Sequence, residues 1–109
     1  MKTYNLYFEL KETASESEVL KIASEFANDL QLKGVIDSWA INVLTNAISF
    51  TEMLKYHMAI DFKDESHMER GFGEVRSKYM NEEPHSQLMS SVSTFKVTFT
   101  ERVKEDLVQ

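Results

Sequence analysis

The 109-residue sequence contains no cysteine and very little proline or glycine. Without cysteine there is no disulfide, no thiolate ligand for zinc or an iron–sulfur cluster, and no cysteine nucleophile. One proline and three glycines leave little room for a low-complexity tail, and 42% hydrophobic residues are enough to form a core. We therefore expect one globular domain, residues 1–109, ordered nearly from end to end.

Positive charge is also scarce, because 12 Lys and Arg stand against 18 Asp and Glu, for a net charge of −6. No basic run could neutralise consecutive phosphates, so we expect neither nucleic acid nor an anionic membrane as a partner. No apolar run is long enough to span a membrane, and the first ten residues lack the apolar stretch of a signal peptide. These features predict a cytoplasmic protein.

What the sequence does contain is regular patterning. Alternation of apolar and polar residues predicts four strands, at 3–10, 36–43, 56–62 and 93–103. Two other segments repeat apolar residues at i, i+4, i+7 and i+11, which is typical of helices that bury one face. These residues are Val19, Ala23, Phe26 and Leu30 in the first segment, and Met68, Phe72, Val75 and Tyr79 in the second.

Capping residues set the expected helix ends. Thr13 or Ser15 can begin the first helix, which should run to about Lys33 and stop at Gly34, and Asp64 can begin the second. The second helix contains the stretch "GFG" at 71–73. Close packing of helix on sheet explains these glycines better than a phosphate loop, since the third glycine of that motif is missing and no strand immediately precedes it. We expect connections at 45–55 and 81–91, the latter with one helical turn opening at Pro84.

The order strand–helix–strand–strand–helix–strand predicts a ferredoxin-like α+β fold, a four-stranded antiparallel or mixed sheet with two helices on one face. Right-handed crossovers place the first and third strands side by side in the middle, where we expect them to be parallel. Eleven apolar residues should face the helices and form the core: Leu6, Phe8, Trp39, Ile41, Val43, Met58, Ile60, Phe62, Phe95, Val97 and Phe99.

The opposite face of this sheet is polar, and nothing in the chain is left to cover it. Such a face is either wet or closed by a second copy into a barrel with a mixed polar interior. We expect a homodimer through the open sheet face, with a cavity that binds a small molecule. Its lining residues would be Asn5, Tyr7, Asn42, His57, Asp61 and Lys96.

Within this set His57 is the candidate catalytic residue. Asp61 lies roughly 13 Å further along the same strand and is too distant to orient His57. Asn5 or Tyr7, on a strand about 4.8 Å away, could do so, and His57 would then act as a general base with Asn5 or Tyr7 as the orienting donor. The alternative is a hydrogen-bonded interface histidine in a non-catalytic dimerisation or protein-interaction module.

The three histidines offer no metal site. His57, His67 and His85 are separated by ten and eighteen residues, a spacing that matches no local ligand motif. We therefore expect no bound metal.

The element order, the length and the open face with its tyrosine and histidine resemble the dimeric α+β barrel superfamily. Members pair sheet to sheet and often hold a ligand between sheet and helices or inside the barrel. Within this superfamily a small bacterial family of unknown function is similar over the stretches "YNLYFELK", "IDSWAINVL" and "YHMAIDFKDESHMERGFGEV".

The superfamily includes cofactor-free quinone-forming monooxygenases, so the resemblance implies oxygenation or proton transfer without a cofactor. It also includes haem-degrading enzymes, which use an asparagine on the first strand, a tryptophan on the third strand and a histidine on the second helix. Asn5 and His67 match two of these positions, but Trp39 lies on the second strand and the third strand has no tryptophan. The comparison favours chemistry that needs no cofactor.

Overall fold

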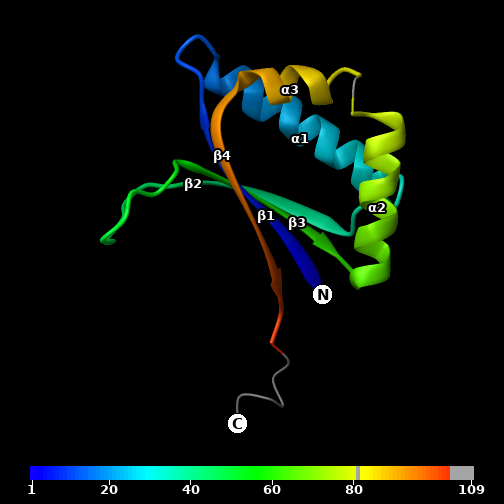
Figure 1. Ribbon diagram of the computed structural model, residues 1–109. Coiled ribbons are helices and arrows are strands. Elements are labelled where there is room, and N and C mark those ends of the chain that lie inside the picture. Colours follow the sequence, from blue (N-terminus) through cyan, green and yellow to red (C-terminus); the bar gives the residue numbers. More distant parts are fainter. Residues whose placement is uncertain (81, 104–109) are drawn as a thin grey trace.

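The computed structural model describes residues 1–80 and 82–103 (Figure 1). Its elements are, in chain order, β1 (Lys2–Leu10), α1 (Glu16–Leu32), β2 (Ser38–Val43), β3 (Tyr56–Phe62), α2 (Glu65–Lys78), α3 (His85–Ser91) and β4 (Val92–Glu101). The predicted βαββαβ order and ferredoxin-like fold are confirmed. The segment before β4, expected to hold a single helical turn, contains the seven-residue helix α3 instead. We also expected order at residues 81 and 104–109, which lie outside the described residues.

The four strands form one sheet in the order β2-β3-β1-β4, and every neighbouring pair is antiparallel. β1 and β3 are adjacent in the middle, as predicted, but the expected parallel direction is wrong. The crossover through α1 makes β1 and β2 parallel, whereas the turn from β2 to β3 reverses the chain. β3 is inserted between them and therefore runs antiparallel to both.

Among the described residues, the helices α1, α2 and α3 all lie on one side of the sheet, and no helix covers the other side (Figure 1). Ser15, the second of the two expected caps, is the N-cap of α1, and its Oγ accepts a hydrogen bond from the backbone N–H of Glu18. Lys33 is the C-cap, and Gly34 follows with a φ of 74°, a conformation that glycine adopts without steric cost. The centre of the core lies beneath α1 and α2, where Phe62 is only 2% exposed.

α2 approaches the sheet closely at Gly71, which confirms the packing interpretation of this glycine. A Cβ atom at Gly71 would lie 2.6 Å from Cε1 of Phe62 and 2.7 Å from the carbonyl oxygen of Val35. Gly73 differs, because a Cβ atom there would meet nothing within 4 Å. Asp64 caps α2 as predicted, accepting the N–H of His67 at 2.8 Å.

Three residues expected in the core are largely exposed instead. Val43, Phe95 and Phe99 have relative exposures of 43%, 59% and 57%. All three lie on the edge strands β2 and β4, where the face assignment holds but the helix layer covers the sheet only in part. Phe99 still meets Phe72 of α2 edge to face, at a centroid distance of 6.1 Å. The alternating pattern predicts the side of the sheet and not the extent of the helix layer above it.

The connection between β2 and β3 is an arm that extends away from the rest of the domain (Figure 1). Its base is closed by the N–H of Leu44, which donates to the carbonyl oxygen of Lys55 at 2.7 Å. Ile48 and Phe50 on this arm are fully exposed. The arm thus carries apolar side chains that the described part of its own chain does not cover.

Candidate functional site

The polar residues predicted to share the open face do share it. Strand register sets Tyr7 opposite His57 on β3 and opposite Lys96 on β4. Asn42 of β2 also lies opposite His57. Directly paired residues project to the same side of a sheet, and side chains two apart on one strand do so too. All six predicted site residues therefore lie on the side away from the helices: Asn5, Tyr7, Asn42, His57, Asp61 and Lys96.

His57 is at the centre of a hydrogen-bonded group. Its Nε2 lies 2.9 Å from Oδ1 of Asn5, and its Nδ1 lies 3.4 Å from Nδ2 of Asn42. The amide of Asn5 is oriented in turn, because its Nδ2 donates to Oγ1 of Thr100 at 2.9 Å. With Oδ1 of Asn5 as acceptor and Nδ2 of Asn42 as donor, the network assigns a neutral ring that is protonated at Nε2 and carries its lone pair on Nδ1.

Tyr7 completes the group by stacking on the imidazole. The two ring centroids are 4.6 Å apart and the planes differ by 11°. Asn5 beside them is 6% exposed even in the single chain. Burial lowers the pKa of His57 and so favours the uncharged imidazole, the form that a general base requires.

Asp61 belongs to a separate cluster on the same face. Oγ1 of Thr3 donates to one carboxylate oxygen at 2.5 Å, and Oγ of Ser38 donates to the other at 2.9 Å. Both partners of Asp61 are thus hydroxyls, in agreement with the prediction that it is too distant to orient His57. Lys96 is exposed on the edge strand β4.

The structure thus brings Asn5, Tyr7, Asn42 and His57 together and leaves Asp61 and Lys96 outside the group. Sequence reasoning had not singled out the hydroxyls of Thr3, Ser38 and Thr100, which hydrogen-bond to these residues. The alternating pattern places these three residues on the polar face of the sheet. Which polar residues they contact follows only from the strand register.

His67, the residue that matches the haem-degrading enzymes, has a structural role. It is 8% exposed, its Nδ1 accepts the N–H of Lys63 at 3.1 Å, and its Nε2 donates to the carbonyl oxygen of Gly34 at 2.9 Å. Both ring nitrogens are therefore bound to backbone groups, and His67 lies on the helix side of the sheet while Asn5 lies on the open side. The residues of this chain do not fit that haem-binding set.

A cavity of about 390 Å³ lies on the helix side, between the sheet and the three helices, and is called the helix-side cavity below. Its walls are mostly apolar, with Phe26 and Leu30 from α1, Ile60 from β3 and Phe72 from α2 among them. The alternating patterns treated this space as filled core. Cavity volume depends on how far side chains reach across a layer, which periodicity does not encode.

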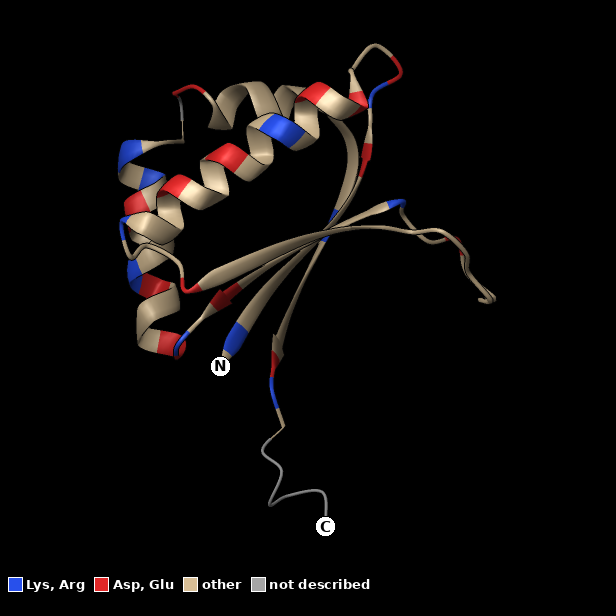
Figure 2. Ribbon diagram, turned by 180° about the vertical axis from the view of Figure 1, so that it is seen from behind, with Lys and Arg blue, Asp and Glu red and all other residues tan. Residues whose placement is uncertain are grey.

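A broader cleft of about 670 Å³ lies outside the core, between the end of α1 and α2. Its rim is lined by Lys33, Arg70 and Lys78, of which Lys33 pairs with Asp29 and Lys78 with Glu74 in exposed ion pairs. Figure 2 shows basic and acidic residues interleaved along α2. This cleft is a solvated surface whose ion pairs are exposed and contribute little, and basic residues outnumber acidic ones in its lining.

A metal site and a membrane-spanning helix each place requirements on the residues that the structure describes. Over residues 1–80 and 82–103, no group of three or more His, Asp or Glu is placed to hold a metal ion. Within the same part of the chain, each helix is too short or too polar to cross a membrane.

Several solved structures share this fold. A dimeric ferredoxin-like protein from an uncultured marine organism has a TM-score of 0.66 at 15% identity, with 95% of each chain covered. A dimeric ferredoxin-like protein of unknown function from Thermobifida fusca has a TM-score of 0.58 at 7% identity, covering 91% of this chain and 88% of that one. Hydroxynitrile lyase from Passiflora edulis has a TM-score of 0.61 at 10% identity, covering 91% and 90%. At these identities the likeness concerns the fold alone.

No curated protein matches the sequence. A family model does, over residues 1–102, and it describes a family of unknown function, DUF6614. The match spans every helix and strand of the structure. The chain therefore belongs to the DUF6614 family, and it has a ferredoxin-like fold.

Proposed function

We propose that this protein is a homodimer that pairs the open faces of two sheets and binds a small molecule between them, with His57 as the base of a cofactor-free proton transfer. The observation that carries the proposal is the ordered group of Asn5, Asn42 and His57, with Tyr7 stacked on the imidazole, on the side of the sheet that no helix covers. Two of the similar solved structures are described as dimeric, which supports the assembly.

The chemistry of the open face supports its burial against a second copy. Burying polar side chains is costly unless they are hydrogen-bonded. Here Asp61 is already satisfied by Thr3 and Ser38 within the face, and Asn5 is satisfied by Thr100 and His57. A partner sheet can therefore cover these groups without leaving them unpaired.

The arm between β2 and β3 gives a second reason to expect a partner. It extends beyond the sheet and carries the fully exposed side chains of Ile48 and Phe50. β2 is an edge strand, so the arm extends from the edge of the sheet. From there its side chains can contact a second sheet that faces this one. Burial of both side chains against a second copy would add apolar area to the interface.

The geometry around His57 suits proton abstraction at Nδ1. The contact of Nδ1 with Asn42 is long, at 3.4 Å, so a substrate can replace Asn42 at little cost. When the proton arrives at Nδ1, the Nε2–H group still donates to Asn5, whose oxygen stabilises the imidazolium. The substrate class that fits is a small neutral molecule with an acidic C–H or phenolic O–H group.

Substitution of a small residue on the open face tests the assembly. Ala40 is exposed in the single chain and lies opposite Ala59, so Ala40→Arg places a long charged side chain in the proposed interface without disturbing the core. In light scattering after size exclusion, we expect dimers for the wild type and monomers for Ala40→Arg. Glu25→Arg, at an exposed position of α1, is the matched control and should remain dimeric. A wild-type monomer at micromolar concentration, or a dimeric Ala40→Arg variant, would contradict the proposal.

A generic base-promoted reaction tests the role of His57. The ring opening of a nitrobenzisoxazole requires only a base near an apolar surface, and its product absorbs visible light. We expect the protein to accelerate this reaction above the buffer rate and His57→Ala to lose that acceleration. His85→Ala removes a histidine on the other side of the sheet and should keep it. Equal rates for His57→Ala and the wild type would rule out His57 as the base.

The second candidate function is a non-catalytic dimerisation or protein-interaction module. It is favoured by the fact that both ring nitrogens of His57 already have partners, and that Asn5 is nearly buried. This candidate predicts a dimer without any bound small molecule and without base activity.

A further inference from the structure

The helix-side cavity has the dimensions of a ligand site. Its volume of about 390 Å³ falls within the range of about 300–1,000 Å³ that small-molecule pockets occupy. It opens to solvent on one side, since Met80, Met89 and Phe99 in its lining are 45%, 51% and 57% exposed. The cavity lies on the opposite side of the sheet from His57, and it needs no second copy to be formed.

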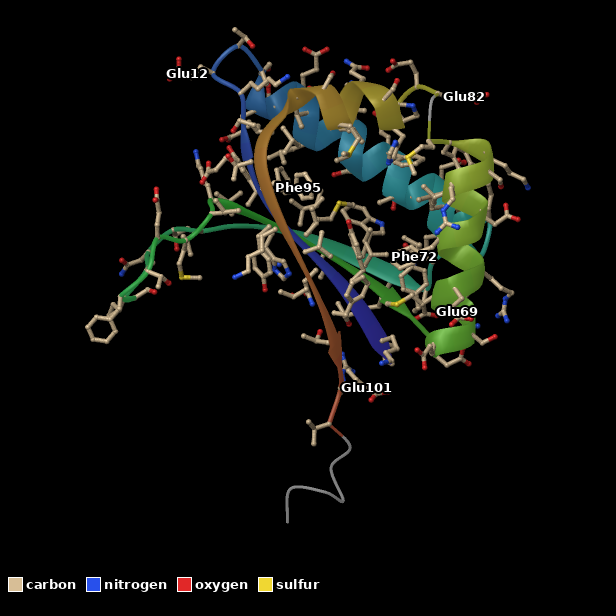
Figure 3. All side chains as sticks on the ribbon, viewed as in Figure 1. Glu12, Glu69, Phe72, Glu82, Phe95 and Glu101 are labelled. Carbon is tan, nitrogen blue, oxygen red and sulfur yellow. The ribbon has the colours of Figure 1, made fainter. Side chains whose placement is uncertain are left out.

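The inner walls of this cavity are apolar, and contacts between aromatic rings hold part of them in place. Phe72 of α2 contacts the rings of Tyr4 and Phe62 edge to face, at centroid distances of 5.5 and 5.6 Å. Figure 3 labels Phe72 at the inner side of α2, where it projects into the space between that helix and the sheet. Leu30 of α1 and Ile60 of β3 complete the wall. Such a surface favours a hydrocarbon chain or an aromatic ring.

The charged and polar groups are few, and the cation among them is Arg76. It follows Phe72 by four residues on α2, so it lies on the same flank of the helix, one turn closer to the end. Arg76 is exposed, and none of the ion pairs among the described residues involves it. His85 lies nearby in the lining, held by Nδ1 donating to the carbonyl oxygen of Met80 and by edge-to-face contact with Phe26.

We propose that this cavity binds an amphipathic carboxylate, with its apolar body among Leu30, Ile60 and Phe72 and its carboxylate on the guanidinium of Arg76. The guanidinium is planar and always charged, and it pairs with a carboxylate through two parallel hydrogen bonds. The stem of Arg76 can lie along the apolar wall while its charged end stays at the water-facing rim. In a chain with a net charge of −6, this local cation is what makes an anionic ligand favourable.

Calorimetric titration of the full chain with decanoate, below its micellar concentration and near pH 7.5, tests the proposal. We expect saturable binding that Arg76→Gln weakens about tenfold or more, the usual effect of losing a charged hydrogen bond. Arg70→Gln is the matched control, because Arg70 is on the same helix but outside the cavity, hydrogen-bonded to Ser66. Decan-1-ol has the same chain without the charge, so its affinity should be the same for the wild type and Arg76→Gln.

A cavity-filling variant tests where the chain of the ligand lies. Leu88 lines the cavity from α3 and is only half-buried, so Leu88→Trp should fill the space while the thermal unfolding midpoint shows that the fold is kept. It should abolish the binding of decanoate and decan-1-ol alike. Absence of decanoate binding to the wild type, equal affinity in Arg76→Gln, or undiminished binding in a folded Leu88→Trp variant would each overturn the proposal. None of these results bears on His57, which lies on the other face.

Discussion

Replacing Gly71 by alanine measures how closely α2 is packed against the rest of the core. A Cβ atom at this position would lie 2.6 Å from Cε1 of Phe62 and 2.7 Å from the carbonyl oxygen of Val35. Both distances are well inside van der Waals contact. Phe62 is almost fully buried, and the oxygen of Val35 belongs to the backbone, so neither can move aside without displacing its neighbours.

The expected effect combines two opposing terms. Alanine is a better helix former than glycine and gains about 1 kcal/mol in a helix interior. Overpacking of a filled core costs about 1–3 kcal/mol, and the two short contacts at Gly71 call for the upper part of this range. We therefore expect Gly71→Ala to lower the free energy of unfolding by about 1–2 kcal/mol. Gly73→Ala, where nothing lies within 4 Å, should raise it by about 0.5–1 kcal/mol.

Urea unfolding followed by far-UV circular dichroism measures both effects. All variants should be compared at one protein concentration, because the stability of an oligomer depends on it. A shift of the midpoint at constant slope reports the change in stability. If Gly71→Ala proved as stable as the wild type, or more stable, the close approach of α2 to the sheet would be refuted.

Three further predictions concern hydrogen-bonded polar groups. Asp64→Ala removes the cap of α2 and should cost about 1 kcal/mol in urea unfolding, whereas Asp64→Asn should retain most of the stability. His67→Ala removes a buried ring and its two hydrogen bonds to the backbone of Lys63 and Gly34, and should cost about 2 kcal/mol in the same assay; a loss near zero would contradict its structural role. Burial lowers the pKa of His57 below its unfolded value of about 6.5, so the unfolded chain binds the proton more readily. Stability should be full above pH 6.5 and fall as the pH drops toward the folded pKa, and His57→Gln should flatten this dependence between urea midpoints at pH 7.5 and 5.5.

The faces of the strands were predictable because alternation has a period of two residues, and a shift by one residue would expose the whole apolar set. His57 and Tyr7 could thus be placed on one face before their register was known. The parallel direction expected for β1 and β3 was wrong, because the crossover rule governs strands joined through a helix, and these two are not joined in that way. α3 was expected only as a single turn opening at Pro84, because seven residues are too few to establish a helical period.

For the candidate site, the sequence indicated which residues share a face but not which of them touch. The contacts of His57 with Asn5 and Asn42 depend on register and rotamer, and the stacking of Tyr7 on the imidazole depends on the twist of the strands. The helix-side cavity could not be predicted at all. It arises where side chains from the sheet and three helices fail to meet. Arg76 is a candidate ligand-binding residue only because it lies at this cavity.

Native mass spectrometry of protein purified without added ligand tests the central claim most directly, because one spectrum reports both the assembly and any molecule that it carries. A homodimer that closes two polar sheet faces around a binding site should appear at twice the chain mass, with a reproducible small-molecule adduct, while Ala40→Arg should appear at the single chain mass. A wild-type monomer that persists at micromolar concentration would contradict the account, since the group around His57 would then lie on an open, wet surface.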